Sequence, residues 1–363
     1  MNSITTIDTS SGAGRDDRGF GIRVLVVDDS LIVRSVFSRL VEEEDGLVLA
    51  GALSNAEGAL QLLASERVDV VLLDLEMPGM GGMAALPQVL AKAPNAKVLV
   101  VSSTTADGAE ATVQALAQGA ADTLQKPTSG GFDRDYREKL VAKIRALGRR
   151  SLRREVQAPA APVLRPASRR RAEIVAIGAS TGGIHAIGQL FNPLPRGLGV
   201  PILVTQHLLP SFNDAFCRQL GEVSGLPTQA AQDGMLLQPD HVYVAPGKAH
   251  LVVVKGSGGH VIRLDKRPAP SGCKPSVDPM FASIAMTHGP AALGVVLTGM
   301  GRDGTEGAIE LCQAGGTILA QNEASSAVWG MPGSVARAGL ASAVLHPFDL
   351  ATKVARLVAH GGG

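Results

Sequence analysis

The sequence predicts an α/β chain of two doubly wound domains with mostly parallel sheets, joined by a linker. Its length of 363 residues favours two domains over one. In both halves, apolar runs of strand length alternate with segments of helical periodicity. Several central runs are apolar at every position, which is typical of parallel strands that helices cover on both faces.

Charge divides the chain into three parts. Residues 1–147 carry 14 Lys and Arg against 20 Asp and Glu, residues 148–173 carry 8 against 2, and residues 174–363 carry 12 against 11. Residues 1–20 contain no apolar core of a signal peptide and are expected to form a disordered tail. The three cysteines, Cys217, Cys273 and Cys312, are odd in number and widely spaced. They fit neither a disulfide framework nor a zinc motif, so a reducing cytoplasm is expected.

The first domain, residues 21–147, is expected to contain five strand–helix pairs. Strand-like runs lie at residues 22–27, 47–53, 68–75, 96–102 and 121–127. Helical patterns follow these runs and begin at Leu31, Ala56, Gly82, Ala106 and about Phe132, the last one ending near Leu147. This alternation predicts a flavodoxin-like parallel sheet with its polar site at the carboxyl ends of the strands.

Polar side chains follow four of these strands at the point where each strand ends. They are Asp28 and Asp29 after the first run, Asp74 after the third, Ser102 after the fourth and Lys126 after the fifth. Three carboxylates at one edge would repel one another unless a hard cation lay between them, and Mg²⁺ prefers such oxygen ligands. A single acid is easily explained as a helix cap, Asp29 especially. The whole set instead indicates a site for a phosphoryl group.

The motifs VDDS, LLDLEMPGM, VVSS and QKP occur in this order, and the first domain resembles the receiver domain of response regulators over its whole length. The resemblance implies that Asp74 accepts a phosphoryl group from a histidine kinase. It also implies roles for the neighbouring groups: Asp28 and Asp29 as Mg²⁺ ligands together with Asp74, the backbone carbonyl of Glu76 as a further ligand, Ser102 as a hydroxyl switch and Lys126 as the phosphate contact.

Residues 148–173 join the two domains and mix Ala, Pro and eight Arg residues without apolar periodicity. The first third can extend the preceding helix, and the Pro-rich remainder predicts a solvated, semi-extended linker. Binding to nucleic acid or to an anionic membrane is the alternative for so basic a segment. A third interpretation is that this segment docks on the acidic first domain.

The second domain, residues 174–356, again alternates apolar runs with helical patterns. Strand-like runs lie at residues 174–178, 200–206, 241–246, 250–256, 260–265, 291–299 and 315–322. Between about 228 and 270, two-residue alternation and Gly/Pro turns predict short hairpins, an antiparallel insertion in an α/β domain. Residues 357–363 are expected to form a C-terminal tail.

Residues 174–183, IVAIGASTGG, lead from an apolar run into a Gly-rich turn that a helical segment follows. A serine at such a turn, here Ser180, is well placed to act as a nucleophile. His207 and Asp303 follow two other apolar runs, so the three side chains would share one crevice if the strands are parallel. Serine needs a base, histidine can supply it, and a carboxylate fixes the tautomer of the histidine.

Each of these residues also has a plain structural interpretation. The Gly-rich turn could bind a nucleotide phosphate, although no Lys follows it as in a P-loop. Asp303 and Glu306 fit a capping pattern, and His207 could bind a backbone carbonyl. Asp278 before Pro279 is interpreted as a helix N-cap. No His, Cys and Asp spacing in this half predicts a catalytic metal.

The motifs IGASTGG, TQHLLPSF, KPSVD, LTGMGRDG and AQNEASSAVWGMP lie between about residues 174 and 345, and this part resembles the catalytic domain of the chemotaxis protein-glutamate methylesterases. The resemblance implies that Ser180 is the nucleophile, His207 the general base and Asp303 the orienting acid. It also places two neighbours in the active site: Thr181, and Met300, whose backbone N–H would be an oxyanion donor.

The two resemblances together imply a cytoplasmic, phosphorylation-activated esterase that hydrolyses glutamyl γ-methyl esters on chemoreceptors. They imply that the receiver domain inhibits the catalytic domain until Asp74 is phosphorylated, with a histidine kinase as phosphodonor and Mg²⁺ as the receiver's cofactor. Deamidation of receptor glutamines is left open. No cofactor is expected for ester hydrolysis, and no nucleic acid or membrane insertion is expected.

The alternative is a response regulator whose second half is non-catalytic or binds DNA. The neutral charge of the second half, the low aromatic content of 3% and the lack of a helix-turn-helix pattern speak against DNA binding.

Overall fold

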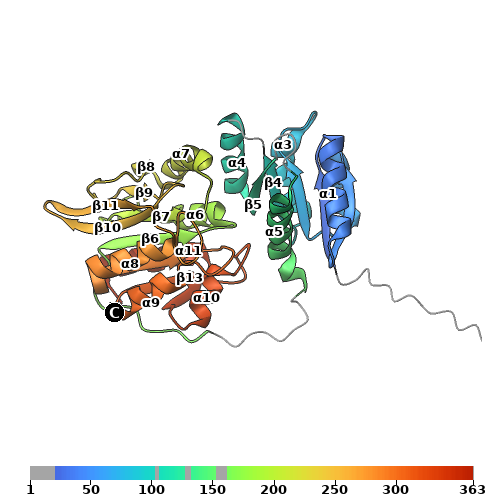
Figure 1. Ribbon diagram of the computed structural model, residues 1–363. Helices are drawn as coiled ribbons and strands as arrows, with labels where there is room; N and C mark the ends of the chain where they lie inside the picture. Colours follow the sequence, from blue (N-terminus) through green and yellow to red (C-terminus); the bar gives the residue numbers. More distant parts are fainter. Residues whose placement is uncertain (1–20, 103–105, 127–131, 153–161, 363) are drawn as a thin grey trace, which may run out of the picture.

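The computed structural model describes residues 21–102, 106–126, 132–152 and 162–362, which form two α/β domains side by side (Figure 1). The tail expected at residues 1–20 lies outside this part. Among the described residues, no helix is both long enough and apolar enough to cross a membrane.

The first domain contains a five-stranded parallel sheet in the order β2-β1-β3-β4-β5. The strands are β1 (Ile22–Val27), β2 (Leu47–Leu53), β3 (Val70–Asp74), β4 (Lys97–Ser102) and β5 (Asp122–Gln125). The helices are α1 (Leu31–Glu43), α2 (Ala56–Ser65), α3 (Gly81–Lys92), α4 (Ala106–Gln118) and α5 (Arg134–Leu152). The predicted flavodoxin-like alternation is confirmed, and β3, the middle strand, is buried at every position.

Short polar side chains fix where two of these helices begin. The Ser30 side chain accepts a hydrogen bond from the backbone N–H of Val33, and the Asn55 side chain accepts one from Gly58. These are N-caps that satisfy amide groups at the first turn. Because Ser30 caps α1, the capping interpretation of Asp29 is wrong.

The basic joint is partly helical and partly attached to the second domain. Helix α5 continues past the expected end at Leu147 to Leu152. Residues 162–173 have no regular secondary structure, but the backbone N–H of Arg165 donates to Ala341 O at 3.0 Å and that of Ala172 donates to Leu357 O at 3.0 Å. The described end of the joint therefore lies along the second domain instead of extending into solvent.

The second domain contains a seven-stranded sheet in the order β14-β13-β12-β6-β7-β9-β8, in which every pairing is parallel. Its strands are β6 (Ile174–Ala179), β7 (Ile202–Gln206), β8 (Thr228–Ala230), β9 (Val242–Val244), β12 (Ala292–Val296), β13 (Thr317–Gln321) and β14 (Ala343–Leu345). A separate antiparallel hairpin consists of β10 (His250–Gly256) and β11 (Gly259–Asp265).

The hairpin insertion is confirmed, but it is shorter than the sequence suggested. Strands β8 and β9 belong to the parallel sheet, because residues 231–241 return to the same end of the sheet before β9 begins. Among the described strands, only β10 and β11 form a hairpin.

Helices cover both faces of the second sheet. They are α6 (Gly183–Phe191), α7 (Asn213–Ser224), α8 (Val277–His288), α9 (Thr305–Gln313), α10 (Met331–Arg337) and α11 (Pro347–His360), with the short 3₁₀ turns η3 (Pro210–Phe212) and η4 (Gly289–Ala291). One apolar core lies under α6, α7 and α11, and a second lies under α8, α9 and the hairpin. Helix α11 occupies most of the expected C-terminal tail.

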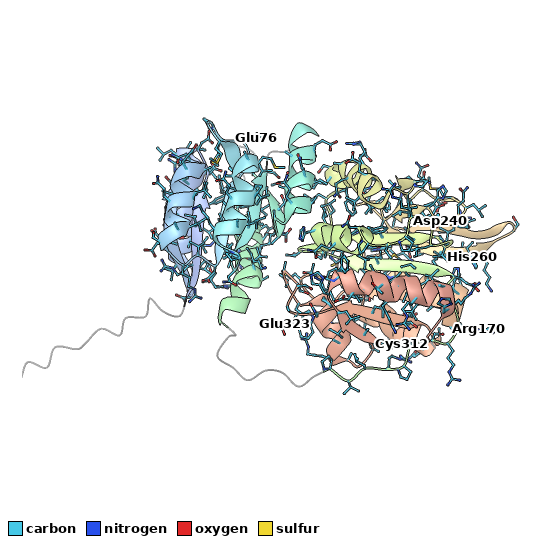
Figure 2. All side chains as sticks on the ribbon, turned by 180° about the vertical axis from the view of Figure 1, so that it is seen from behind. Glu76, Arg170, Asp240, His260, Cys312 and Glu323 are labelled. Carbon is cyan, nitrogen blue, oxygen red and sulfur yellow. The ribbon has the colours of Figure 1, made fainter. Side chains whose placement is uncertain are left out.

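The α4 and β5 side of the first domain faces the second domain, where α4 packs on α6, α7 and η3 (Figure 1). The backbone N–H of Gly182 donates to Ala121 O at 2.6 Å, and the His185 ring nitrogen Nδ1 donates to Ala117 O at 2.8 Å. Arg218 on α7 forms an ion pair with Glu110 on α4. Glu76 lies on the first domain, whereas Asp240 and His260 lie at the opposite end of the molecule (Figure 2).

Candidate active site and phosphoryl site

Three adjacent strands of the second sheet carry the predicted triad. Ser180 follows β6, His207 follows β7 on one side, and Asp303 lies in the loop after β12 on the other side. The strand order turns away from β6 in both directions, and this is the topological switch point at which α/β sheets form their crevices. Parallel pairing therefore places the three residues at one edge.

The turn around Ser180 depends on two glycines. Gly182 has a positive φ of 77°, and a Cβ there would lie 2.6 Å from Ala327 Cβ. A Cβ on Gly183 would lie 2.1 Å from the Gln206 side chain on β7. Only glycine allows this sharp entry into α6 and this close approach of β7. The backbone N–H of Ser180 donates to Thr298 O at 3.0 Å, which fixes the turn against the loop after β12.

His207 and Asp303 form a tight pair. Nε2 of His207 lies 2.7 Å from Oδ2 of Asp303, and the same carboxylate accepts from Ser276 Oγ at 2.6 Å and from the Val277 N–H at 2.7 Å. Because an ionised carboxylate can only accept, Nε2 carries the proton and Nδ1 is the remaining ring nitrogen.

The pair stabilises its own charges. Burial opposes the charged form of His207, but the hydrogen bond to Asp303 and the nearby Cys273 raise the pKa of His207 to about 9. Burial also opposes ionisation of Asp303, yet hydrogen bonds from His207 and Ser276 hold the pKa of that carboxyl well below its usual range. At neutral pH the resting state is therefore an imidazolium–carboxylate pair.

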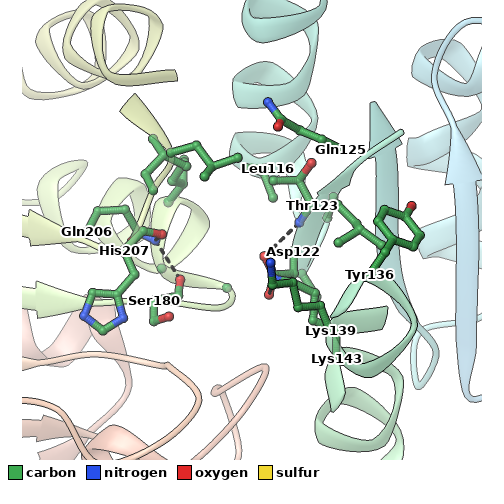
Figure 3. Close-up of a pocket in the computed structure, with 18 residues that line it drawn as sticks. Leu116, Asp122, Thr123, Gln125, Tyr136, Lys139, Lys143, Ser180, Gln206 and His207 are labelled. Carbon is green, nitrogen blue, oxygen red and sulfur yellow. Dashed lines mark hydrogen bonds and ion pairs between the residues drawn. The ribbon is translucent and has the colours of Figure 1, made fainter. Parts of the chain in front are cut away.

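Ser180 and His207 line a cavity of about 360 Å³ between the two domains. Figure 3 shows them on one wall, with Asp122, Lys139 and Lys143 of the first domain on the other. Within the described part of the chain, Ser180 Oγ forms no hydrogen bond to the imidazole. Catalytic hydrogen bonds are often long or poorly aligned without substrate, so the absence of this bond is compatible with a resting site.

The two predicted neighbours differ in their contacts. Gly299 lies against the nucleophile, since a Cβ added at Gly299 would lie 2.8 Å from Ser180 Cβ. Met300 is the next residue, so its backbone N–H starts beside Ser180. The structure, over its described residues, gives the Met300 N–H no partner. Thr181 is buried, and its Oγ1 donates to Asp122 Oδ2 of the first domain at 2.7 Å.

Several supporting residues lie within the quoted motifs KPSVD and TQHLLPSF, but the sequence predicted no role for them. Ser276 links Asp303 to His250. Its hydroxyl donates to the Asp303 carboxylate, and its backbone N–H donates to His250 Nδ1 at 2.9 Å. Gln206 donates from its side chain to Ser180 O at 2.9 Å. Their distant or ordinary positions in the sequence hid these contacts.

The N-cap interpretation of Asp278 is wrong. Ser276 is the N-cap residue of α8, Asp278 lies in the first turn, and Asp278 Oδ1 accepts from the Gly307 N–H at 2.9 Å. Burial raises the pKa of Asp278 to about 7, and the neighbouring Asp303 contributes to the rise. Asp278 therefore joins α8 to α9 beneath the triad.

The first domain brings its predicted polar residues together as well. Carboxylate oxygens of Asp28, Asp29 and Asp74 lie within 4.8 Å of one another. Lys126 Nζ lies 2.6 Å from Asp74 Oδ2 and 3.2 Å from Asp28 Oδ2. Asp28 Oδ2 is buried and has no hydrogen bond of good geometry. This oxygen and the converging acids fit a hard divalent cation.

The remaining receiver residues surround this cluster. The Glu76 N–H donates to Asp74 Oδ1 at 3.1 Å, and the hydroxyls of Ser102 and Thr123 lie 3.3 Å apart. Burial raises the pKa of Asp74, and Asp28 adds to the rise while Lys126 opposes it.

Asp122 connects the two domains. Besides accepting from Thr181, Asp122 Oδ2 accepts from Lys143 Nζ at 2.6 Å, and Asp122 Oδ1 accepts from the Thr123 N–H at 2.8 Å. The first residue of β5 therefore bonds both to the residue after Ser180 and to the residue beside Ser102.

Comparison with known proteins agrees with this division. The family described as CheB methylesterase matches residues 175–354, and that described as response regulator receiver domain matches residues 24–131. A protein-glutamate methylesterase/protein-glutamine glutaminase of Rhodospirillum rubrum is 41% identical, with 96% of this chain and 98% of that protein covered. A second, of Caulobacter vibrioides, is 46% identical, with 90% and 96% covered.

A solved structure gives the same result for the second domain. The CheB methylesterase catalytic domain of Thermotoga maritima is 36% identical, with 52% of this chain and 99% of that structure covered, and the TM-score is 0.50.

Proposed function

Because the chain belongs to the CheB methylesterase family and its first domain matches the response regulator receiver domain, we propose that it hydrolyses glutamyl γ-methyl esters on chemoreceptors. Relatives are named for a glutaminase activity as well. The same acyl transfer with ammonia as the leaving group would convert receptor glutamines to glutamates, and we include it as a second activity.

In the proposed mechanism, Ser180 Oγ attacks the ester carbonyl while His207 Nδ1 takes the Ser180 proton. The tetrahedral oxyanion accepts a hydrogen bond from the Met300 N–H, and the imidazolium then protonates the departing methoxide oxygen, which leaves as methanol. Water attacks the acyl-enzyme with the same base, which releases the glutamate carboxylate and restores Ser180. Asp303 holds the ring through Nε2 and stabilises its positive charge.

In the receiver domain, we propose that Asp74 accepts a phosphoryl group from a histidine kinase. Asp28, Asp29 and Asp74, with the Glu76 carbonyl, would hold Mg²⁺, which supplies positive charge for the phosphoryl oxygens when bound. Lys126 would contact the phosphoryl group.

Regulation follows from the interface between the domains. The first domain covers one side of the Ser180 cavity and bonds to Thr181 through Asp122. A receptor helix needs that space, so we propose that this closed arrangement is inhibitory. Phosphorylation would draw Ser102 toward the new phosphoryl group, and Thr123 and Asp122 of β5 would transmit the change to the interface.

The catalytic proposal is carried by Ser180 and His207 lining one cavity, with Asp303 hydrogen-bonded to His207 behind it. Methyl-labelled receptor incubated with the full chain should release labelled methanol, and Ser180→Ala should reduce release by a factor of about 10³ or more. Equal release by Ser180→Ala would exclude Ser180 as the nucleophile.

The phosphorylation proposal has a separate test. A small phosphodonor should stimulate the full chain, and Asp74→Asn should lose this stimulation while keeping basal methanol release. If Asp74→Asn still responds to the phosphodonor, Asp74 is not the switch.

A further inference from the structure

A thiol beside the triad has no part in the proposed mechanism. Cys273 lies in the loop before α8, and its Sγ belongs to a group in which one ligand atom each of His207, Cys273 and Asp303 lies within 4.8 Å of the others. The three residues come from loops after β7, before α8 and after β12. Their separation in sequence explains why no metal motif was visible there.

The three donor types match those of zinc sites. Thiolate sulfur, imidazole nitrogen and carboxylate oxygen are the ligands that Zn²⁺ takes, commonly three from the protein with a fourth position for water. Hard cations such as Mg²⁺ prefer oxygen alone, so this site differs in kind from the Asp28, Asp29 and Asp74 cluster.

Two of the ligands are already held in place by contacts behind them. Asp303 accepts from Ser276 Oγ and the Val277 N–H, and the His207 backbone N–H donates to Ala179 O at 3.0 Å. Hydrogen bonds such as those to the Asp303 carboxylate are characteristic of carboxylates that ligate metals, whereas the backbone bond of His207 fixes only the position of its main chain. The Cys273 thiol is half-buried, and its Sγ lies 3.9 Å from Ser271 O, a long and weak contact.

Binding requires one small rearrangement. His207 Nε2 and Asp303 Oδ2 are 2.7 Å apart, because a proton lies between them. Two ligands on a tetrahedral zinc are roughly 3.3 Å apart, given Zn–N and Zn–O bonds of about 2.0 Å. The ring must therefore move by about half an ångström, and the metal replaces the shared proton.

We propose that His207, Cys273 and Asp303 form a binding site for a thiophilic divalent cation, Zn²⁺ being the probe, and that its occupancy inhibits the esterase. The Cys273 thiol and the His207 imidazolium each release one proton to solvent, and the ring nitrogen freed in this way donates its lone pair to the metal. A neutral imidazole bound in this way keeps its one proton on the other nitrogen. Neither nitrogen can then accept the Ser180 proton. The inhibitory consequence rests on the proposed function; the binding site does not.

Cobalt(II) provides a test of binding that is independent of activity. Titration of the metal-free full chain with Co²⁺ should produce a thiolate-to-cobalt charge-transfer band at one equivalent, and Zn²⁺ should abolish it. Cys273→Ala and Cys273→Ser should lack the band, whereas Cys217→Ala on α7 should keep it. The receiver cluster contains only oxygen ligands and gives no such band. A band that persists in Cys273→Ala, or no band in the unmodified chain, would overturn the site.

Inhibition is measured as methanol release in Zn²⁺ divided by release of the same variant in chelator. Loss of the thiol should raise the half-inhibitory zinc concentration at least about tenfold, since even outer contacts of metal ligands change affinity by 10–100-fold. Equal inhibition of wild type and Cys273→Ala would refute the inhibitory role. A chain that gives the cobalt band but releases no methanol at all would contradict the proposed esterase and leave the metal site standing.

Discussion

At the scale of single residues, the charge of His207 is set by the carboxylate behind it. Asp303 accepts three hydrogen bonds and remains ionised, and its negative charge favours the imidazolium. The proposed base must be neutral before it can take the Ser180 proton. The closed resting state therefore contains a base that is largely protonated at neutral pH.

This charge predicts the pH dependence of the reaction. Since the pKa of His207 is raised to about 9, the neutral ring appears as pH rises, and kcat/KM should increase up to about pH 9 and then level off. Methanol release by the full chain should be measured between about pH 6 and about pH 10.

Ser180→Ala measured in parallel gives the rate of hydroxide-driven hydrolysis, which is subtracted at each pH. A rise of kcat/KM centred at about pH 6.5, the ordinary pKa of histidine, would show that Asp303 does not raise the pKa of His207 in the working enzyme.

At the scale of elements, the triad depends on how closely α9 packs on α8. A Cβ added at Gly307 would lie 2.5 Å from Asp278 O and 2.8 Å from Phe281 Cβ. The glycine therefore lets the Gly307 N–H reach the Asp278 carboxylate. It also brings the loop that carries Asp303 against the start of α8, where Ser276 and Val277 bind the carboxylate.

Gly307→Ala is accordingly expected to destabilise the second domain by about 1–3 kcal/mol, the usual effect of inserting a methyl group into close packing. Urea unfolding followed by circular dichroism measures this free energy.

Gly188→Ala in α6 is the matched control, because a Cβ there meets no atom within 4 Å. It should be neutral or stabilise by up to about 1 kcal/mol, since alanine favours the helix. Similar destabilisation by both variants would show that the loss of stability is not specific to the α8–α9 contact.

At the scale of the whole molecule, a few polar contacts hold the receiver over the cavity. Asp122 accepts from Thr181 of the other domain and from Lys143 of its own. Hydrogen bonds to charged groups typically contribute about 1.5–3 kcal/mol, so loss of one can shift a two-state interface at least about tenfold.

Asp122→Ala should therefore raise basal methanol release several-fold and reduce the further stimulation by a phosphodonor. Asp135→Ala, which removes an exposed acid from α5, should leave both rates unchanged. Thermal unfolding of both variants verifies that the receiver remains folded. Unchanged basal release by a folded Asp122→Ala would show that this contact does not restrain the catalytic domain.

The sequence was sufficient to predict the two sheets and the polar residues at the carboxyl ends of their strands. Apolar runs such as those of β3 and β12 are buried wherever they lie, and parallel strands necessarily bring their carboxyl ends together. Asp74 and Lys126, or His207 and Asp303, could therefore be paired from their positions after strands.

Only the tertiary structure decided the contacts that do not follow from strand order. The Ser276 donor to Asp303, the Asp122–Thr181 bond between the domains and the position of Cys273 depend on where loops and the interface between the domains place side chains. Periodicity in a sequence specifies which face of an element is buried, because burial of apolar area is local to that element. It carries no information on which distant polar atoms then come within hydrogen-bond distance, since that depends on the packing of the whole chain.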